Sequence, residues 1–246
     1  MQGARQWNTL AGTPHPAPIS GTRAEICSTS TDTVIVMTER TADEQCADGR
    51  DPDPEIGRIA LRIQSARTKG DLGTILAHEI QTYSIFDLQI IGGRLNAEIE
   101  QLPSPYREAV APHFREQLFG KHHRLLAMHH SGAFDRLTNP IPERERFDAF
   151  CTMIPAGTLR WDDTGERNPY FRNPKNRLFY YLIAAFTMFV LEEPGHPVGM
   201  PFPGGFKVEQ RGTEYYCLIR DKEKEVFYSI CNFCPALQNE ENAPRR

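Results

Sequence analysis

Three cysteines near the C-terminus have a type and spacing that suit metal binding. Cys231 and Cys234 are separated by two residues, and Cys217 lies thirteen intervening residues upstream. Two thiolates on one tight turn form a knuckle that can hold a soft metal ion. A closed tetrahedral zinc site needs a fourth ligand, for which His196 is preferred to Cys151 because it begins the connector into the same segment. The pattern predicts a zinc site of three cysteines and one histidine, with a 4Fe–4S cluster as the alternative.

Two other interpretations of these cysteines stay open, and the spacing sets a condition on metal binding. The thiols could be buried and unreactive, or Cys231 and Cys234 could form a redox pair, although no βαβ pattern surrounds them. If a hairpin turn lies at residues 222–223, Cys217 faces Tyr228, and Cys231 is roughly 10 Å further along at about 3.4 Å per residue. A site therefore forms only if the chain folds back after Ile230.

The other polar clusters do not have the spacing of a known catalytic or metal site. Helical metal-binding pairs are usually four residues apart, whereas two histidine pairs on one predicted helix are offset by six to eight residues: His122, His123, His129 and His130. The sequence has no P-loop, dinucleotide fingerprint, nucleophile elbow or zincin motif. Catalytic residues are therefore not assigned, and whether the protein is an enzyme stays open.

A basic and aromatic cluster over residues 170–177 could bind an anion or RNA. It contains Arg172, Lys175 and Arg177 next to Tyr170 and Phe171. The chain as a whole carries 28 Lys and Arg against 32 Asp and Glu, a net charge of -4. No global positive field exists to attract phosphates, so a solvated helix start is favoured over a nucleic-acid site.

Composition and hydropathy predict a cytoplasmic protein outside the membrane. The start, MQGARQWNTLAG, lacks the apolar stretch of a secretory signal. The most apolar run, Leu178–Leu191, has fourteen residues, which is short of the roughly 20 that a bilayer requires, so we expect a buried core helix. In a reducing cytoplasm the six cysteines are thiols or metal ligands and not disulfides.

The chain divides by composition into a helical part and a small β-rich part. Residues 1–54 are rich in Thr, Ser, Pro, Gly and Asp, which predicts a disordered tail, and Met37 is an alternative start of translation. Residues 55–192 are expected to form a helical domain, and residues 193–238 a β-module packed on it, with a disordered tail at 239–246. The predicted fold class is mainly α (α+β): a helical bundle followed by a small antiparallel β-module with a cysteine knuckle.

Hydrophobic periodicity and capping residues place the expected elements. Asp71 is interpreted as an N-cap, Ser84 with Asp87 as a capping box, and Ser104-Pro105 as the start of a long helix bent near Pro112. The predicted helices cover about 56–63, 71–83, 84–102, 104–130, 143–153 and 176–192, and the predicted strands are Phe206–Glu209, Tyr215–Ile219 and Val226–Ile230.

The C-terminal motifs resemble a family of archaeal proteins, mostly from methanogens, that is catalogued as a domain of unknown function. The resemblance is carried by His196-Pro197-Val198-Gly199, Phe202-Pro203-Gly204-Gly205, Tyr215-Tyr216-Cys217 and Cys231-Asn232-Phe233-Cys234-Pro235. It extends over about residues 70–238, with Leu218 where the family often has proline. The resemblance implies an anaerobic archaeal cytoplasm, which favours an iron–sulfur cluster more than composition does, and it implies no established activity.

Three functional hypotheses follow from these residues. In the first, the protein is a metal-binding accessory or protein-interaction factor in methanogen metabolism, and its helical body docks a protein partner. In the second, it is a redox carrier or metalloenzyme that uses a cluster at Cys217, Cys231 and Cys234. In the third, it binds RNA around Tyr170–Arg177.

Overall fold

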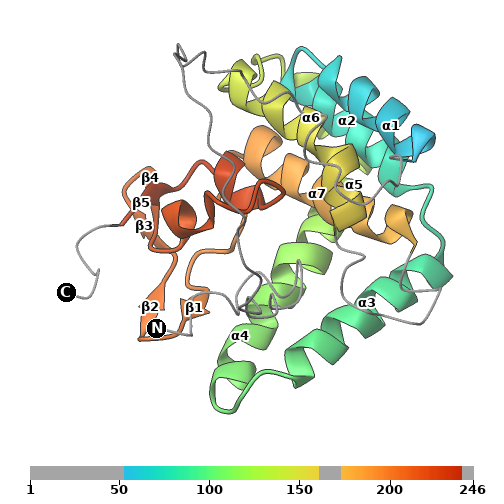
Figure 1. Ribbon diagram of the computed structural model, residues 1–246. Helices are drawn as coiled ribbons and strands as arrows, with labels where there is room; N and C mark the ends of the chain where they lie inside the picture. Colours follow the sequence, from blue (N-terminus) through green and yellow to red (C-terminus); the bar gives the residue numbers. More distant parts are fainter. Residues whose placement is uncertain (1–52, 161–172, 240–246) are drawn as a thin grey trace, which may run out of the picture.

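Seven α-helices make up most of the part of the chain that the structure describes. The computed structural model describes residues 53–160 and 173–239 (Figure 1). The helices are α1 (Pro54–Gln64), α2 (Lys69–Ile80), α3 (Ile85–Glu100), α4 (Tyr106–Arg115), α5 (Lys121–His130), α6 (Arg144–Arg160) and α7 (Pro174–Ala185). Small sheets follow near the C-terminus, so the predicted class, mainly α with a C-terminal β-module, is confirmed.

Helix α7 is the central helix of the core. Together with the π-helical turn η6 (Phe186–Val190), it replaces the predicted single helix over 176–192, and nearly all of its side chains are buried. It contacts α2 and α6, whereas α3 packs mainly against α4 (Figure 1). Within the described residues, no helix is both long enough and apolar enough to cross a bilayer.

Capping boxes fix the starts of α2 and α3. Asp71 was the predicted N-cap of α2, but that position belongs to Thr68, whose hydroxyl accepts a hydrogen bond from the Asp71 amide at 3.0 Å. The Asp71 carboxylate accepts in return from the Thr68 amide at 3.0 Å, so Asp71 is the third helical residue. The predicted box of Ser84 and Asp87 is confirmed at the start of α3.

The predicted long helix over 104–130 is present as three consecutive segments. The π-helical turn η3 (Glu116–Gly120) lies between α4 and α5 and widens the helix after Pro112. The extra turn directs Phe119 toward α3, where its ring would lie 3.4 Å from a Cβ placed on Gly92. This is an ordinary van der Waals distance, and a Cβ on Gly93 would meet no atom within 4 Å, so close approach does not account for the two glycines in α3.

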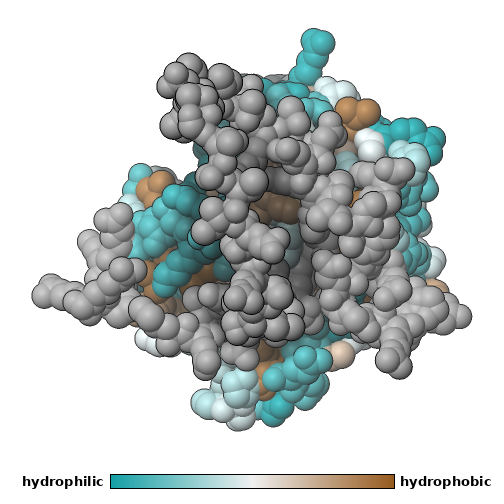
Figure 2. All heavy atoms as spheres, viewed as in Figure 1, coloured by the Kyte–Doolittle hydropathy of each residue, from teal (hydrophilic) through white to brown (hydrophobic). Residues whose placement is uncertain are grey.

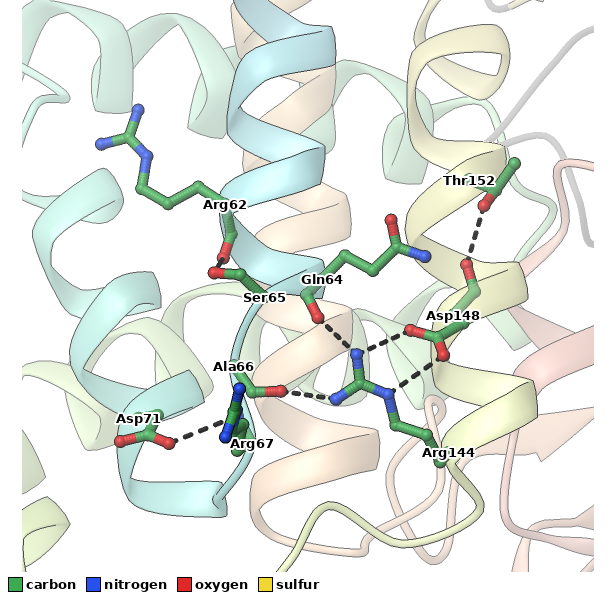
Figure 3. Close-up of polar contacts among 9 residues, drawn as sticks. All are labelled: Arg62, Gln64, Ser65, Ala66, Arg67, Asp71, Arg144, Asp148 and Thr152. Atoms are coloured by element: carbon green, nitrogen blue, oxygen red, sulfur yellow. Dashed lines mark hydrogen bonds and ion pairs between the residues drawn. The ribbon is translucent and has the colours of Figure 1, made fainter.

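Arg144 at the start of α6 joins that helix to the link between α1 and α2. Its guanidinium donates to the backbone oxygens of Gln64 and Ala66, and its Nε donates to Asp148 at 3.0 Å (Figure 3). The carbonyl groups at the end of α1 thus receive a charged donor in place of water.

The C-terminal module contains two small sheets. In the first, β1 (Pro201–Phe202) pairs antiparallel with β2 (Phe206–Lys207). In the second, β4 (Glu214–Cys217) lies between antiparallel β3 (Glu209–Arg211) and parallel β5 (Leu237–Gln238). The first two predicted strands are therefore partly right.

The predicted strand Val226–Ile230 is wrong. The amide of Val226 donates to Glu223 at 2.9 Å and the amide of Ser229 donates to Val226 at 2.9 Å, so the segment forms local turns. The pairing of Cys217 with Tyr228 is wrong for the same reason, because Cys217 pairs with Gln238 of β5.

One hydrophobic core runs through the helices and the C-terminal module. It extends from Ile56 in α1 to Ala236 beside β5. Across the junction, the Phe150 and Phe233 rings lie 5.3 Å apart and the Tyr181 hydroxyl donates to the Tyr228 carbonyl at 3.0 Å. On the face in Figure 2 the described surface is mostly hydrophilic, with hydrophobic residues in small patches.

The predicted disordered tails fall almost entirely outside the described residues. In the N-terminal segment 1–54, only Asp53 and Pro54 are described, and they are the N-cap and the first residue of α1. Met37 lies outside the described residues. Of the segment 239–246, only Asn239 is described, and its side chain is buried.

Candidate functional site

The fold places Cys217, Cys231 and Cys234 within electrostatic reach of one another. Cys217 ends β4, Cys231 lies in the short helical turn η8 (Ile230–Phe233), and Cys234 follows that turn. Because β5 runs parallel to β4, the chain does fold back after Ile230, which was the condition for a site. The three cysteines are 4%, 3% and 5% exposed, in that order.

The three thiols are close enough to influence one another's ionisation. Burial, with added repulsion from the neighbouring Cys234, raises the pKa of Cys217 to about 11. Burial likewise raises the pKa of Cys231 well above its ordinary value, with added repulsion from Cys234 and Cys217. Deprotonation of one thiol therefore disfavours deprotonation of the others unless a cation neutralises the shared charge.

Backbone amides oppose the effect of burial at two of the sulfurs. The Gly195 amide donates to the Cys234 Sγ at 3.4 Å, and the Ala236 amide is a second donor to that sulfur. Cys217 receives the amides of Ile219 and Arg220 in the same way. Hydrogen bonds to the charged form lower a pKa, so these four donors favour the thiolate.

His196 and Cys151, the two candidates for a fourth ligand, lie in different surroundings. The His196 ring centre is 6.1 Å from that of Phe202, and burial lowers the pKa of the imidazole to about 4, so the ring is neutral at pH 7. Cys151 lies on α6, where burial and then Asp148 raise its pKa to about 12. Among the described residues, no three His, Cys, Asp or Glu side chains are positioned to hold a metal ion, so the ligand set stays a prediction.

The sequence did not identify the groups that surround the sulfurs. Arg220 and Arg146 act on Cys234 through their positive charge, and Gly195 acts through its amide. Tyr180 interacts electrostatically with Cys231 and Cys234. Tyr180 lies within the apolar run that predicted a core helix. Backbone donors cannot be recognised from residue types, so the cysteine spacing could not reveal these neighbours.

Not every residue of the basic cluster expected at the start of α7 is exposed. Arg177 is 2% exposed, and its Nη1 donates to the Thr158 carbonyl at 3.1 Å. The Lys175 ammonium lies 5.2 Å from the centre of the Tyr83 ring. Tyr170, Phe171 and Arg172 lie outside the described residues. The interpretation of Arg177 as part of a solvated helix start is therefore wrong.

Three of the four helical histidines, His122, His129 and His130, make aromatic contacts. The His129 ring centre is 5.3 Å from that of His78 on α2, and the His122 ring centre is 5.5 Å from that of Phe179 on α7. Burial, followed by His123, lowers the pKa of His122. These contacts are those of rings packed between helices.

The three cysteines lie within the segment of the chain that matches a known protein family. The family model described as "Uncharacterized protein conserved in archaea (DUF2115)" matches residues 68–239. A UPF0305 protein of Methanopyrus kandleri is 30% identical over 139 residues, which are 56% of this chain and 88% of the relative. One of Methanocaldococcus jannaschii is 22% identical over 162 residues, 65% of this chain and 89% of the relative.

Another relative matches over a shorter segment. A UPF0305 protein of Methanothermobacter thermautotrophicus is 40% identical over 58 residues, and the match covers 24% of this chain and 35% of the relative. No solved structure matches the chain. The family description and the names of these relatives state no activity, ligand or partner.

Proposed function

The chain belongs to the archaeal family of uncharacterised proteins that matches residues 68–239, and we propose that it is a cytoplasmic metal-binding accessory protein. In this proposal a soft metal ion, zinc in the first instance, binds Cys217, Cys231 and Cys234. The ion stabilises the C-terminal module against the helical body, and the protein contributes to methanogen metabolism through a protein partner and not through chemistry at the metal.

The observation that carries the proposal is the pair of backbone amides directed at each of two sulfurs. Cys217 and Cys234 accept two amides apiece and lie within electrostatic reach of each other and of Cys231. A thiol in an apolar core needs no such donors, because it behaves as a small hydrophobic group. A metal-bound thiolate does need them, because they stabilise its charge in a site that excludes water.

Burial supports a structural role for the metal. Structural zinc sites are closed by four protein ligands, whereas catalytic sites keep one position open to water or substrate. All three cysteines are buried, which fits a closed site. Metal binding would draw the three side chains closer together, with His196 in its neutral, metal-binding form as the fourth ligand.

The test is the metal content of protein purified without oxygen, with Cys234→Ser and Cys151→Ser as a matched pair. Both variants lose one buried thiol, but only Cys234 lies in the thiol cluster. We expect about one zinc per chain in the wild type and in Cys151→Ser, and none in Cys234→Ser. Replacement of zinc by Co²⁺ should give the intense thiolate-to-cobalt absorption of a site with several sulfur ligands.

Three outcomes would contradict the proposal in different ways. A brown protein that contains iron and sulfide would show that the same cysteines hold an iron–sulfur cluster instead of zinc. A wild-type protein without metal, which also fails to bind added Zn²⁺ or Co²⁺ anaerobically, would show that the cysteines are structural thiols. Unchanged metal content in Cys234→Ser would exclude that cysteine as a ligand.

A further inference from the structure

Two arginines, one from the helical body and one from the C-terminal module, act on the thiol cluster. Arg146 belongs to α6, which contacts the turn η8 that contains Cys231. Arg220 begins the short helical turn η7 (Arg220–Glu223), which also contacts η8. Both guanidiniums act on Cys234 through their positive charge, and Arg220 acts on Cys217 as well. Positive charge from both parts of the molecule therefore reaches the same sulfurs.

One N–H group of each arginine pairs with a carboxylate. The Arg146 Nη2 lies 2.7 Å from the Glu143 Oε1, and the Glu143 side chain is 60% exposed. The Arg220 Nη1 lies 2.8 Å from the Asp221 Oδ1, and the other oxygen of Asp221 pairs with Lys224 at 2.9 Å. Ion pairs near the surface contribute little to stability, so they do not account for burial of the rest of each guanidinium.

The Nε groups of the two arginines are in a different situation. The Nε atoms of Arg146 and Arg220 are both buried, and neither has a hydrogen-bond partner among the described residues. A buried donor without an acceptor is costly, and such donors are rare in folded proteins. An acceptor at the thiol cluster would remove this cost at both positions.

The sulfurs become good acceptors only when they are ionised. A thiol is a weak acceptor, whereas hydrogen bonds to a charged acceptor are roughly twice as strong as neutral ones. Cys217 and Cys234 already receive two backbone amides each, and one of the donors to Cys217 is the amide of Arg220. Cys231 differs, because the Ser229 hydroxyl and the buried Glu223 carboxyl act on it. The arginines therefore add to the donors of Cys217 and Cys234.

We propose that Arg146 and Arg220 are positioning residues of the metal site, whose Nε groups donate to the thiolate sulfurs when the ion is bound. Each thiol releases its proton to the solvent as the bond between sulfur and metal forms, and the thiolate then provides the acceptor that the arginine needs. This inference rests on metal binding by the cysteines as proposed above. Because Arg146 comes from α6, it also ties the metal-loaded module to the helical body.

The experiment is a titration of metal-free, full-length protein with Co²⁺, without oxygen and in competition with a chelator. Arg146→Gln and Arg220→Gln should each bind Co²⁺ about tenfold or more weakly than the wild type, which is the usual effect of removing a group that orients metal ligands. The thiolate-to-cobalt absorption should also move to longer wavelength, because a thiolate that loses a donor gives up its electrons more readily.

Two kinds of variant separate this role from a purely structural one. Glu143→Gln removes the exposed ion pair of Arg146 but keeps the guanidinium, so its Co²⁺ affinity should stay within about twofold of the wild type and its absorption should be unchanged. Arg146→Lys and Arg220→Lys keep the positive charge without the Nε donor. They should recover part of the affinity that the glutamine variants lose.

The outcomes distinguish this inference from the proposed function. Unchanged affinity and absorption in both glutamine variants, beside a wild type that binds Co²⁺, would overturn the role of the arginines and leave the proposed function intact. Weaker binding without a shift in absorption, equal in the lysine variants, would show that the arginines act only by packing and would also overturn it. A wild type that does not bind Co²⁺ would contradict the proposed function and this inference with it. If Arg146→Gln fails to fold, Arg146→Lys and the two Arg220 variants provide the decision.

Discussion

Replacing Glu98 by glutamine should stabilise the protein in alkaline solution and leave its stability almost unchanged in acid. The ordinary pKa of this carboxyl is 4.5, and burial raises it to about 7 in the folded protein. Glutamine resembles the protonated carboxyl in shape and carries no charge. The variant therefore avoids the cost of ionising a group held among Leu95, Phe114 and other apolar side chains, which line a small pocket between α3, α4 and α7.

The size of the effect follows from proton linkage. A folded-state pKa above the unfolded one means that the folded protein holds its proton more tightly. The associated stability is complete below pH 4.5 and is lost as the pH rises through about 7. At about 1.4 kcal/mol per pKa unit, the span between these two values corresponds to roughly 3 kcal/mol. Glu98→Gln should thus exceed the wild type by about 3 kcal/mol near pH 8 and match it near pH 4.

The assay is urea unfolding, followed by far-ultraviolet circular dichroism at several pH values. The control is Glu100→Gln on the same helix, because its carboxylate is 73% exposed and lies outside the pocket. The difference between this control and the wild type should stay nearly constant with pH. A constant difference for Glu98→Gln, or one that grows toward acid, would refute the inference that Glu98 is ionised at a cost in the folded protein.

Two further substitutions test the packing and the helix starts, again by urea unfolding. Gly70→Ala should destabilise the protein by about 2 kcal/mol, because the added Cβ would lie 2.3 Å from the Phe134 carbonyl oxygen. The control Gly57→Ala meets no atom within 4 Å and should stabilise the protein by about 0.5 kcal/mol. Equal effects of the two variants would refute the close approach of Gly70 to Phe134. Ser84→Ala removes the hydroxyl that accepts from the Asp87 amide and should cost about 1 kcal/mol, so an unchanged stability would show that the cap contributes little.

The helices were predictable because their signals are local. Apolar side chains at helical spacing determine which face of α1 or α3 is buried, and Ser84 with Asp87 marks a start that needs no tertiary information. The N-cap of α2 was misplaced by three residues because Thr68 and Asp71 both suit a cap. The reciprocal hydrogen bonds between them decide the assignment, and these exist only in the folded backbone.

The pairing of the C-terminal strands was not predictable from local pattern. Val226–Ile230 has the composition of a strand, but its backbone groups are satisfied within turns, and β4 pairs instead with a two-residue strand beyond Cys234. The convergence of the cysteines was anticipated as a condition on the fold, while the donors to their sulfurs were not. The surroundings of Glu98 were not predictable either, because Arg177 comes from a distant helix and Arg94 with Glu98 follows no motif.

Tyr180 on α7 interacts with the thiol cluster and also lines the small pocket that contains Glu98. Its hydroxyl oxygen accepts a hydrogen bond from the Gln117 side chain of η3. Burial raises the pKa of the phenol, and Cys231 and Cys234 add to the effect when they carry charge. The charge state of the thiols therefore acts on a group in the pocket wall, because charges interact more strongly in a medium of low polarity than in water. A metal ion bound as proposed would neutralise the thiolates and so remove their effect on the pKa of Tyr180.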